Sequence, residues 1–238
     1  SMSTSVLVIG ASGSGKSTAL RNLNPEETFI ISVLGKPLPF KGGRSAYKQE
    51  KGGNYYVTDS ADNILKAIVS VDANKRFKNL VIDDWQYVLA NSFMRRAKEK
   101  GYEKFTDIGR DGWLIIKAAC ECRDDLKIFV IAHNEIDEKG NSKVKTIGKM
   151  LDDKITIEGM FTIVLHTWVE DGKYKFITQT DGHKIAKSPM GMFSESLIDN
   201  DLLEVSKAID AYYDEANVSI VKDVKQHEPQ VKLELQED

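Results

Sequence analysis

The nine residues from Gly10 to Thr18, GASGSGKST, follow directly on the apolar run Val6–Ile9. They match the pattern GxxxxGK[ST], which is typical of a loop that binds phosphate between a strand and a helix. Backbone N–H groups of such a loop surround the phosphates, and the start of the next helix adds partial positive charge. The pattern therefore predicts a bound nucleotide; the alternative is a glycine-rich turn whose lysine has no ligand.

Two side chains of this loop have expected chemical roles. Lys16 is expected to bridge the β- and γ-phosphates, and the Ser17 hydroxyl is expected to ligate Mg²⁺. A helix is expected to open at Lys16. The full set of predicted nucleotide contacts is Gly10, Ala11, Ser12, Gly13, Ser14, Gly15, Lys16, Ser17 and Thr18.

A second apolar run, Asn79 to Ile82, ends in the two acids Asp83 and Asp84. The carboxyl ends of parallel strands form the edge of a sheet where ligands bind. We expect Asp83 to hold the metal together with Ser17, and Asp84 to be a candidate for polarising the attacking water. Adjacent residues on a strand point to opposite faces, so the two acids need not share a role. The alternatives are a turn acid at Asp83 and a helix cap at Asp84.

A third apolar strand, residues 127–132, ends in His133-Asn134-Glu135. A polar side chain at this edge can touch the γ-phosphate and report its presence to the following loop. His133 is the first candidate for such a sensor and Asn134 the second. A histidine that is merely hydrogen-bonded at a strand end is the competing interpretation.

Strand and helix patterns alternate along most of the chain, which predicts an α/β fold with a mostly parallel central sheet flanked by helices. The segment from residue 160, with the turn Asp171-Gly172, predicts an antiparallel hairpin at the C-terminal edge of the sheet. Expected strands are 5–9, 28–33, 79–83 and 127–133, and expected helices are 61–72, 86–100, 109–124 and 201–214. We expect one domain over 1–214 and a flexible tail over 215–238.

The composition excludes some classes of protein. The net charge is −3 and the sequence pI about 5.9, so nucleic-acid contact would come from local patches and not from the overall field. There is no run of 18 apolar residues and no charged leader followed by an apolar stretch, so we expect no membrane partner and a cytoplasmic location. Cys120 and Cys122 are expected to be reduced helix cysteines.

The order of these motifs resembles the RecA-like P-loop ATPases. Further stretches, LVIDDW at 80–85, VIAHNE at 130–135, TIGKMLDDKI at 146–155 and AKSPMGMF at 186–193, resemble small phage ATPases that act as single-strand-annealing recombination proteins. The resemblance spans about residues 1–193. It implies ATP and Mg²⁺ as cofactors, single-stranded DNA as a partner, self-association into a ring or filament, and the cytoplasm of a host cell as the location.

The sequence departs from this resemblance at two places. The region FIISVLGKPLPF at 29–40 offers Lys36 where RecA-like enzymes usually carry a catalytic acid, so either Asp84 takes over as the base or hydrolysis is slow. Near AKSPMG, where an arginine is usual, the chain has Lys184 and Lys187, which could act as cationic fingers from a neighbouring subunit. The candidate catalytic residues are Lys16, Asp83, Asp84, His133 and Lys187.

Two polar loops, 41–56 and 137–149, combine features that single-strand binding requires. The first interleaves cations with tyrosines, and the second carries lysines directly after the sensor strand. Cations suit phosphates and aromatic faces suit bases. The alternative is an ordinary solvated loop or a protein contact. The candidate nucleic-acid residues are Lys41, Arg44, Tyr47, Lys48, Lys51, Lys143, Lys145 and Lys149.

Three functions fit these observations. The first is an ATP-hydrolysing recombination protein that binds single-stranded DNA and promotes annealing or strand pairing as an oligomer, with a single-strand-binding protein as a further candidate partner. The second is an ATPase switch that acts on a protein, such as a helicase loader or assembly factor in DNA replication. The third is a small-molecule kinase, ranked last because no arginine-rich lid segment is apparent.

Overall fold

The computed structural model describes residues 2–147 and 156–226, with side chains described up to Asp214 in the last helix. The strands are β1 Thr4–Gly10, β2 Thr28–Ser32, β3 Tyr55–Val57, β4 Asn79–Asp83, β5 Lys127–Ile136, β6 Ser142–Val144, β7 Ile163–Glu170, β8 Lys173–Ile177 and β9 Leu197–Asp199. The α-helices are α1 Gly43–Ala46, α2 Ala61–Ala73, α3 Gln86–Arg95, α4 Glu103–Cys120 and α6 Leu202–Gln226. Short 3-10 helices are η1 Thr18–Leu20, η2 Pro25–Glu27 and η3 Ile157–Met160.

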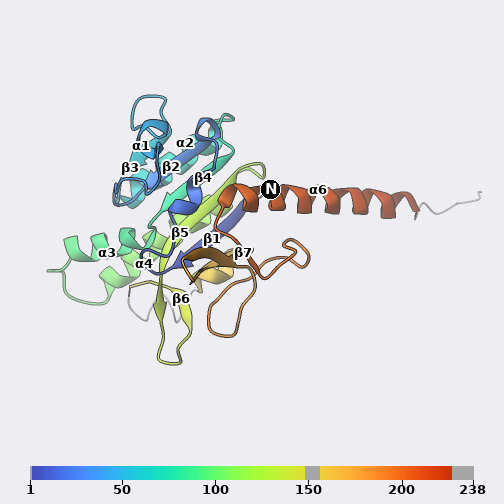
Figure 1. Ribbon diagram of the computed structural model, residues 1–238. Coiled ribbons are helices and arrows are strands. Elements are labelled where there is room, and N and C mark those ends of the chain that lie inside the picture. Colours follow the sequence, from blue (N-terminus) through green and yellow to red (C-terminus); the bar gives the residue numbers. More distant parts are fainter. Residues whose placement is uncertain (1, 148–155, 227–238) are drawn as a thin grey trace, which may run out of the picture.

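The described strands form one mixed sheet in the order β3-β2-β4-β5-β1-β7-β8-β9, with β6 paired to the end of β5 (Figure 1). Pairing is parallel from β3 through β7 and antiparallel between β7, β8 and β9. The predicted fold class is therefore confirmed: a mostly parallel sheet flanked by helices, with an antiparallel hairpin at its C-terminal edge.

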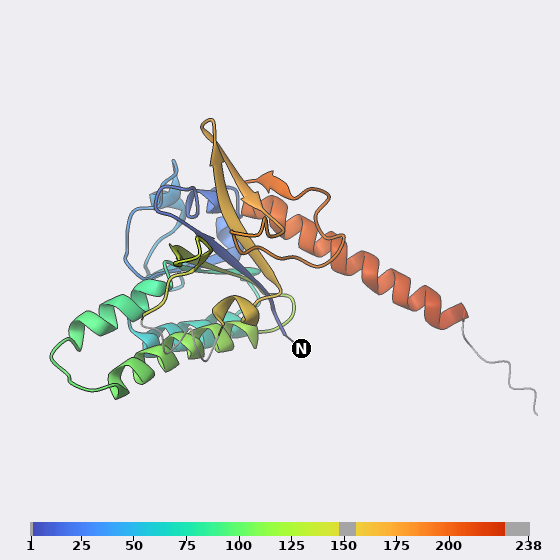
Figure 2. The ribbon, with the colours of Figure 1, turned by 90° about the horizontal axis from the view of Figure 1, so that it is seen from below.

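Both faces of the central strands are buried, which explains why these strands are continuous apolar runs. Side chains such as Leu7 and Ile82 face a core formed with α2, α3 and α4. Their neighbours in sequence, such as Val8 and Val81, face a second core formed with η1 and the start of α6. Beyond this contact, α6 extends away from the body of the protein (Figure 2).

The parallel strands end at one edge. Gly10 pairs in register with His133, and Ser32 pairs with Asp83. Gly10, Ser32 and Asp83 are the last residues of their strands, and His133 lies level with Gly10 on β5, which continues to Ile136. The phosphate-loop motif, the acidic pair and the histidine therefore meet at this edge.

The helix expected over 61–72 and the turn expected at Asp171-Gly172 are both confirmed. The Ser60 side chain accepts a hydrogen bond from the backbone N–H of Asn63 at 3.4 Å, which caps the start of α2. Asp171 and Gly172 have φ of 48° and 71°, the left-handed values that a tight two-residue hairpin turn needs.

The prediction that a helix opens at Lys16 is wrong. The chain forms only the single turn η1 and then turns again at Asn24, whose side chain accepts a hydrogen bond from Glu26 N at 3.1 Å. Pro25 disfavours helical backbone at the residue before it, and β2 begins soon afterwards at Thr28. The loop is therefore followed by one 3-10 turn and not by a long helix.

Three other boundaries differ from expectation. Helix α4 starts at Glu103 and not at 109, because Gly109 and Gly112 are buried and do not end the helix. A Cβ on Gly112 would lie 2.6 Å from Leu89, so glycine permits the close packing of α3 on α4. The expected polar loop over 137–149 is partly a hairpin, since it contains β6, which pairs with the end of β5. Helix α6 continues past residue 214; the division into domain and tail stays a prediction.

Candidate functional site

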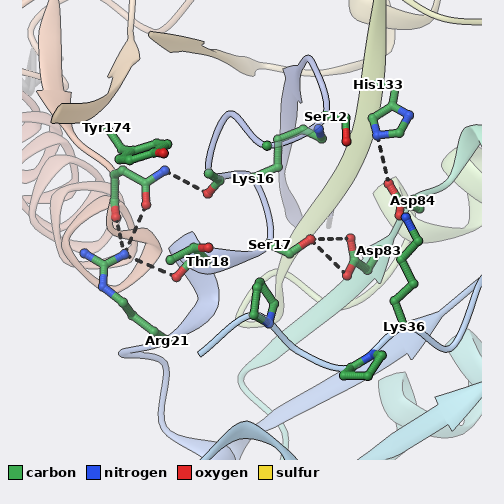
Figure 3. A pocket seen from close by; sticks show the side chains of 15 residues that line it. Ser12, Lys16, Ser17, Thr18, Arg21, Lys36, Asp83, Asp84, His133 and Tyr174 are labelled. Atoms are coloured by element: carbon green, nitrogen blue, oxygen red, sulfur yellow. Dashed lines mark hydrogen bonds and ion pairs between the residues drawn. The ribbon is translucent and has the colours of Figure 1, made fainter. Parts of the chain in front are cut away.

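A cavity of about 640 Å³ lies at the carboxyl edge of the sheet, around the phosphate-loop motif (Figure 3). It brings together residues from the loop, from the segment after β2, from the end of β4, from β5, and from the C-terminal part of the chain. The lining residues are Ser12, Gly13, Gly15, Lys16, Ser17, Thr18, Arg21, Lys36, Pro37, Pro39, Asp83, Asp84, His133, Tyr174 and Asn200.

Backbone conformation and steric space explain why the loop has glycine at three positions. Gly15 has φ of 94°, and a Cβ there would lie 2.7 Å from the Asn200 side chain and 2.9 Å from the Tyr174 ring. A Cβ on Gly10 would lie 1.9 Å from Thr167 Oγ1. Gly13 also has a left-handed φ, 75°, but its missing Cβ would meet nothing within 4 Å. Gly13 and Gly15 are thus needed for the backbone conformation, and Gly10 and Gly15 are needed because a side chain would not fit.

Lys16 is the buried cation of the cavity, with only 6% of its surface exposed. Its Nζ donates a hydrogen bond to the carbonyl oxygen of Ala11 at 2.7 Å, within the loop. Burial lowers the pKa of Lys16 to about 8, against the raising effect of Asp84 and Asp83. A buried ammonium is costly unless it is paired, so this position favours an anionic ligand.

Ser17 and Asp83 form the candidate magnesium site. Ser17 Oγ donates to the two carboxylate oxygens of Asp83 at 3.1 and 3.2 Å. Burial, followed by the neighbouring Asp84, raises the pKa of Asp83 to about 7. A hydroxyl and a carboxylate are hard oxygen donors of the kind Mg²⁺ takes alongside phosphate oxygens and water, so these two residues fit the ion.

Asp84 faces the same cavity as Asp83, contrary to the opposite faces that strand alternation predicts. Its φ is 63°, a left-handed value that few residues other than glycine adopt. This conformation ends β4, and the next N–H, of Trp85, donates to the carbonyl of Ile131 at 2.9 Å. The N-terminus of α3 has no side-chain cap, so the helix-cap alternative for Asp84 is not observed. Backbone strain of this kind clusters at functional sites.

His133 stands beside Asp84, with its Nε2 atom 3.8 Å from Asp84 Oδ1. Its ring contacts Tyr87 edge-on, and its backbone N–H donates to Gln86 Oε1 at 3.0 Å. Burial and the nearby Lys16 lower the pKa of His133, although Asp84 opposes them. The second sensor candidate, Asn134, instead donates to Ser142 Oγ at 2.7 Å and does not line the cavity.

The far end of the cavity is closed by residues that the sequence did not indicate (Figure 3). Asn200, just before α6, donates to the Gly15 carbonyl at 2.8 Å and accepts from Arg21 at 3.1 Å. Tyr174 of β8 lies beside them, 47% exposed. Asn200 and Gly15 are distant in the chain and belong to no common motif, so only the turn of β8 and β9 back toward the loop brings them together.

The two candidate finger lysines lie outside the cavity. Lys184 Nζ lies 4.4 Å from the centre of the Trp168 ring, a cation–π contact. Lys187 pairs its backbone with Val164, donating and accepting at 3.0 and 2.9 Å. Neither lines the cavity of its own chain, and action on a neighbouring subunit stays a prediction.

The first polar loop presents its cations to solvent. Lys41, Arg44, Lys48 and Lys51 are all exposed. Tyr47 differs, because only 5% of its surface is exposed and its ring belongs to the second core. The expectation that the Tyr47 ring is available to bases is therefore wrong: the residue ends α1 and anchors the loop on the sheet.

The second polar loop is placed by the β5–β6 hairpin. Lys143 Nζ lies 3.8 Å from Oε1 of Glu135, the residue that faces it across the hairpin. Lys145 is exposed, and its backbone N–H donates to the carbonyl of His133 at 2.9 Å. Lys149, with most of the stretch 146–155, lies outside the described residues.

Comparisons with known proteins give structural similarity only. No family model matches the sequence, and no curated protein matches it. A KaiC-like protein of the hyperthermophilic archaeon Pyrococcus horikoshii is 16% identical, with 82% of this chain and 88% of that chain covered and a TM-score of 0.43. An ATPase of the type III secretion system of pathogenic bacteria is 12% identical, with 70% of this chain and 51% of that chain covered and a TM-score of 0.45.

Similarity at this level does not assign a function. This chain spans about half the length of the secretion ATPase. Among the residues described, no helix is both long enough and apolar enough to cross a membrane.

Proposed function

We propose that this protein is a RecA-like, magnesium-dependent ATPase that binds single-stranded DNA and promotes annealing or strand pairing as an oligomer. The observation that carries the ATPase part is the bond from Ser17 to both oxygens of Asp83, beside the buried Lys16. Two distant motifs thus meet as a cation site next to a phosphate cradle.

The residues of the cavity have different roles in hydrolysis. Ser17 and Asp83 would hold a magnesium ion, which would neutralise charge on the phosphates of the bound nucleotide. Lys16 holds the same phosphates, and the loop N–H groups orient them. Asp84 takes the proton of the attacking water, because the acid usual after the second strand is replaced by Lys36. His133 contacts the γ-phosphate as a hydrogen-bond donor.

The part of the cavity lined by Tyr174, Asn200 and Arg21, called the nucleoside end below, would hold the nucleoside of the bound nucleotide. The exposed Tyr174 ring offers a stacking face for a base, a contact that favours no particular base strongly. Asn200 and Arg21 are already bonded to each other and to the loop, so they form a fixed wall. This end fits a nucleoside triphosphate better than inorganic phosphate alone.

DNA binding is supported by the exposed cations Lys41, Arg44, Lys48 and Lys51 and by the β5–β6 hairpin. The backbone bond from Lys145 to His133 joins this hairpin to the cavity. A change at His133 on γ-phosphate binding would therefore reach the hairpin directly, which is the kind of coupling that loop switches use.

The second candidate is an ATPase switch that acts on a protein partner, such as a replication assembly factor. It is favoured by α6, which starts next to Asn200 at the phosphate loop and extends away from the body (Figure 2). A partner held by this helix would be connected to the nucleotide site.

The test is the rate of ATP hydrolysis with and without single-stranded DNA, together with DNA binding at two salt concentrations. The recombination proposal expects stimulation by DNA and affinity that falls as salt rises. Hydrolysis without DNA binding or stimulation would reject it and favour the protein-partner switch. Absence of both ATP binding and hydrolysis would reject the ATPase itself.

A further inference from the structure

Lys36 occupies a position in the cavity that the functions above leave unexplained. It lies after β2 and lines the cavity with Asp84 and His133, at the phosphate end (Figure 3). Within the described residues no hydrogen bond or ion pair to a side chain holds its ammonium. Lys16, by contrast, is tied to the loop by the carbonyl of Ala11. Lys36 is therefore a cation that is free to meet a ligand.

The backbone around Lys36 is restricted in conformation. Gly35 has φ of 68°, its N–H donates to Ser32 Oγ at 2.9 Å, and a Cβ there would lie 2.8 Å from Val57. Pro37 restricts the residue before it to extended backbone, so the backbone of Lys36 is restricted too. Pro37 and Pro39 also line the cavity. The backbone is thus restricted in conformation, whereas the lysine side chain keeps several rotatable bonds.

The charge of Lys36 is felt by the other groups at this end. It contributes to lowering the pKa values of Lys16, Asp83 and His133. A positive charge within reach of all three groups also lies within reach of a phosphate held between them. Three cations line the cavity: Arg21 lies beside Asn200, whereas Lys16 and Lys36 lie with Asp83 and Asp84, where the terminal phosphate belongs.

We propose that Lys36 is a catalytic residue that contacts the terminal phosphate of the nucleotide bound by its own chain. This inference rests on the proposed ATPase function. In the reaction, a water oxygen bonds to the γ-phosphorus, the bond to the bridging oxygen breaks, ADP leaves, and Asp84 receives the proton of the water. Lys36 transfers no proton; it stabilises the charge of the transferring phosphoryl group.

This role makes the reaction centre complete within one chain. A second cation is the part that a neighbouring subunit often supplies in trans. With Lys36 in place, Lys184 and Lys187, which lie outside the cavity of their own chain, are not needed for the chemical step. Self-association would then serve DNA binding or assembly, not hydrolysis.

The experiment compares Lys36→Met with Lys66→Met, an exposed lysine on α2 far from the cavity lining. Turnover of MgATP and the affinities for ADP and for a non-hydrolysable ATP analogue are measured for both. Lys36→Met should lower turnover by about 10²-fold, the usual effect of losing one charge-stabilising group. The substitution should lower the affinity for the ATP analogue but leave the affinity for ADP unchanged, because only the γ-phosphate loses a contact.

Lys66→Met should match the wild type, and Lys36→Arg should recover part of the turnover. Wild-type turnover in Lys36→Met would overturn the inference while leaving the ATPase intact. Equal losses of ADP and analogue affinity would overturn it too, because the lysine would then not act at the γ-phosphate. Recovery on mixing Lys36→Met with Lys16→Ala would show action in trans and reject the single-chain centre. A wild type without ATP turnover would reject the proposed function itself.

Discussion

The nucleotide cavity and the loop over residues 41–51 both carry many charges, but they hold them differently. In the cavity, Lys16 and Asp83 are 6% and 8% exposed. In the loop, all four cations are open to solvent. Burying a charge is costly unless a partner compensates for it, whereas exposed lysines that line no cavity are ordinary. The buried charges of the cavity therefore indicate that it binds a charged ligand. The exposed cations of the loop indicate only an electrostatic field that attracts anions.

The largest effect is expected from Lys16→Ala. Loss of the buried ammonium should abolish measurable MgATP binding, because the β- and γ-phosphates lose their cation. The fold should persist, since among the described residues the Lys16 side chain bonds only to a loop carbonyl. Calorimetric titration with ATP and a thermal melt check both parts. The matched control replaces Lys41, Arg44, Lys48 and Lys51 together by Ala and should bind ATP normally. Normal ATP affinity in Lys16→Ala would contradict the site.

The next effect separates backbone conformation from space within the loop. Gly13→Ala and Gly15→Ala both place a side chain at left-handed φ, which costs about 1 kcal/mol of stability each. Only Gly15→Ala also clashes, with Asn200 and Tyr174. Gly15→Ala should therefore lower ATP affinity by at least about tenfold more than Gly13→Ala. Equal affinities in the two variants would show that the wall formed by Asn200 and Tyr174 does not shape the nucleotide site.

A smaller effect is expected when the loop charges are removed. The variant with Ala at Lys41, Arg44, Lys48 and Lys51 should bind single-stranded DNA roughly tenfold more weakly at low salt and with a shallower salt dependence. Fluorescence anisotropy with a labelled oligonucleotide at two salt concentrations measures this. An unchanged salt slope would remove the loop from the DNA-binding surface and leave it as a solvated segment.

The smallest effect tests the buried Tyr47. Burial raises its pKa to about 12, above the value of about 10 expected in an unfolded chain. The stabilisation from the neutral phenol is complete below pH 10 and is lost as pH rises toward 12. Between pH 9 and pH 11 the wild type should lose about 1 kcal/mol of unfolding free energy that Tyr47→Phe does not lose.

Urea unfolding at the two pH values measures this difference. Tyr102→Phe is the matched control, because Tyr102 is 81% exposed and should behave like the wild type. The same pH dependence in Tyr47→Phe and the wild type would contradict the core placement of Tyr47.

The sequence predicted the parts of the site that lie at the ends of buried parallel strands. Gly10, Asp83 and His133 follow continuous apolar runs, and register alone brings such strand ends together. The helix expected after the loop does not form, because Pro25 disfavours helical backbone at Asn24 and the chain turns there. The conformation of Asp84 was also missed, since a left-handed aspartate leaves no pattern in composition or spacing.

The nucleoside end was invisible to sequence reasoning for another reason. Tyr174 and Asn200 come from the hairpin and the segment before α6, and only tertiary structure places them against Gly15. Tyr47 was misplaced because an aromatic residue in a polar, glycine-rich loop has the same sequence signature whether it packs inward or faces solvent. Periodicity gives no information in so short a segment.

The most direct test of the central claim is phosphate release from MgATP by the wild type and by Asp84→Asn, with ATP affinity measured in parallel. The claim predicts that the wild type hydrolyses ATP. It also predicts that Asp84→Asn binds ATP with similar affinity and releases phosphate about 10² to 10⁴ times more slowly, because the general base is lost. Phosphate release at the wild-type rate by Asp84→Asn would contradict this assignment, and a wild type that binds ATP without hydrolysing it would contradict the ATPase.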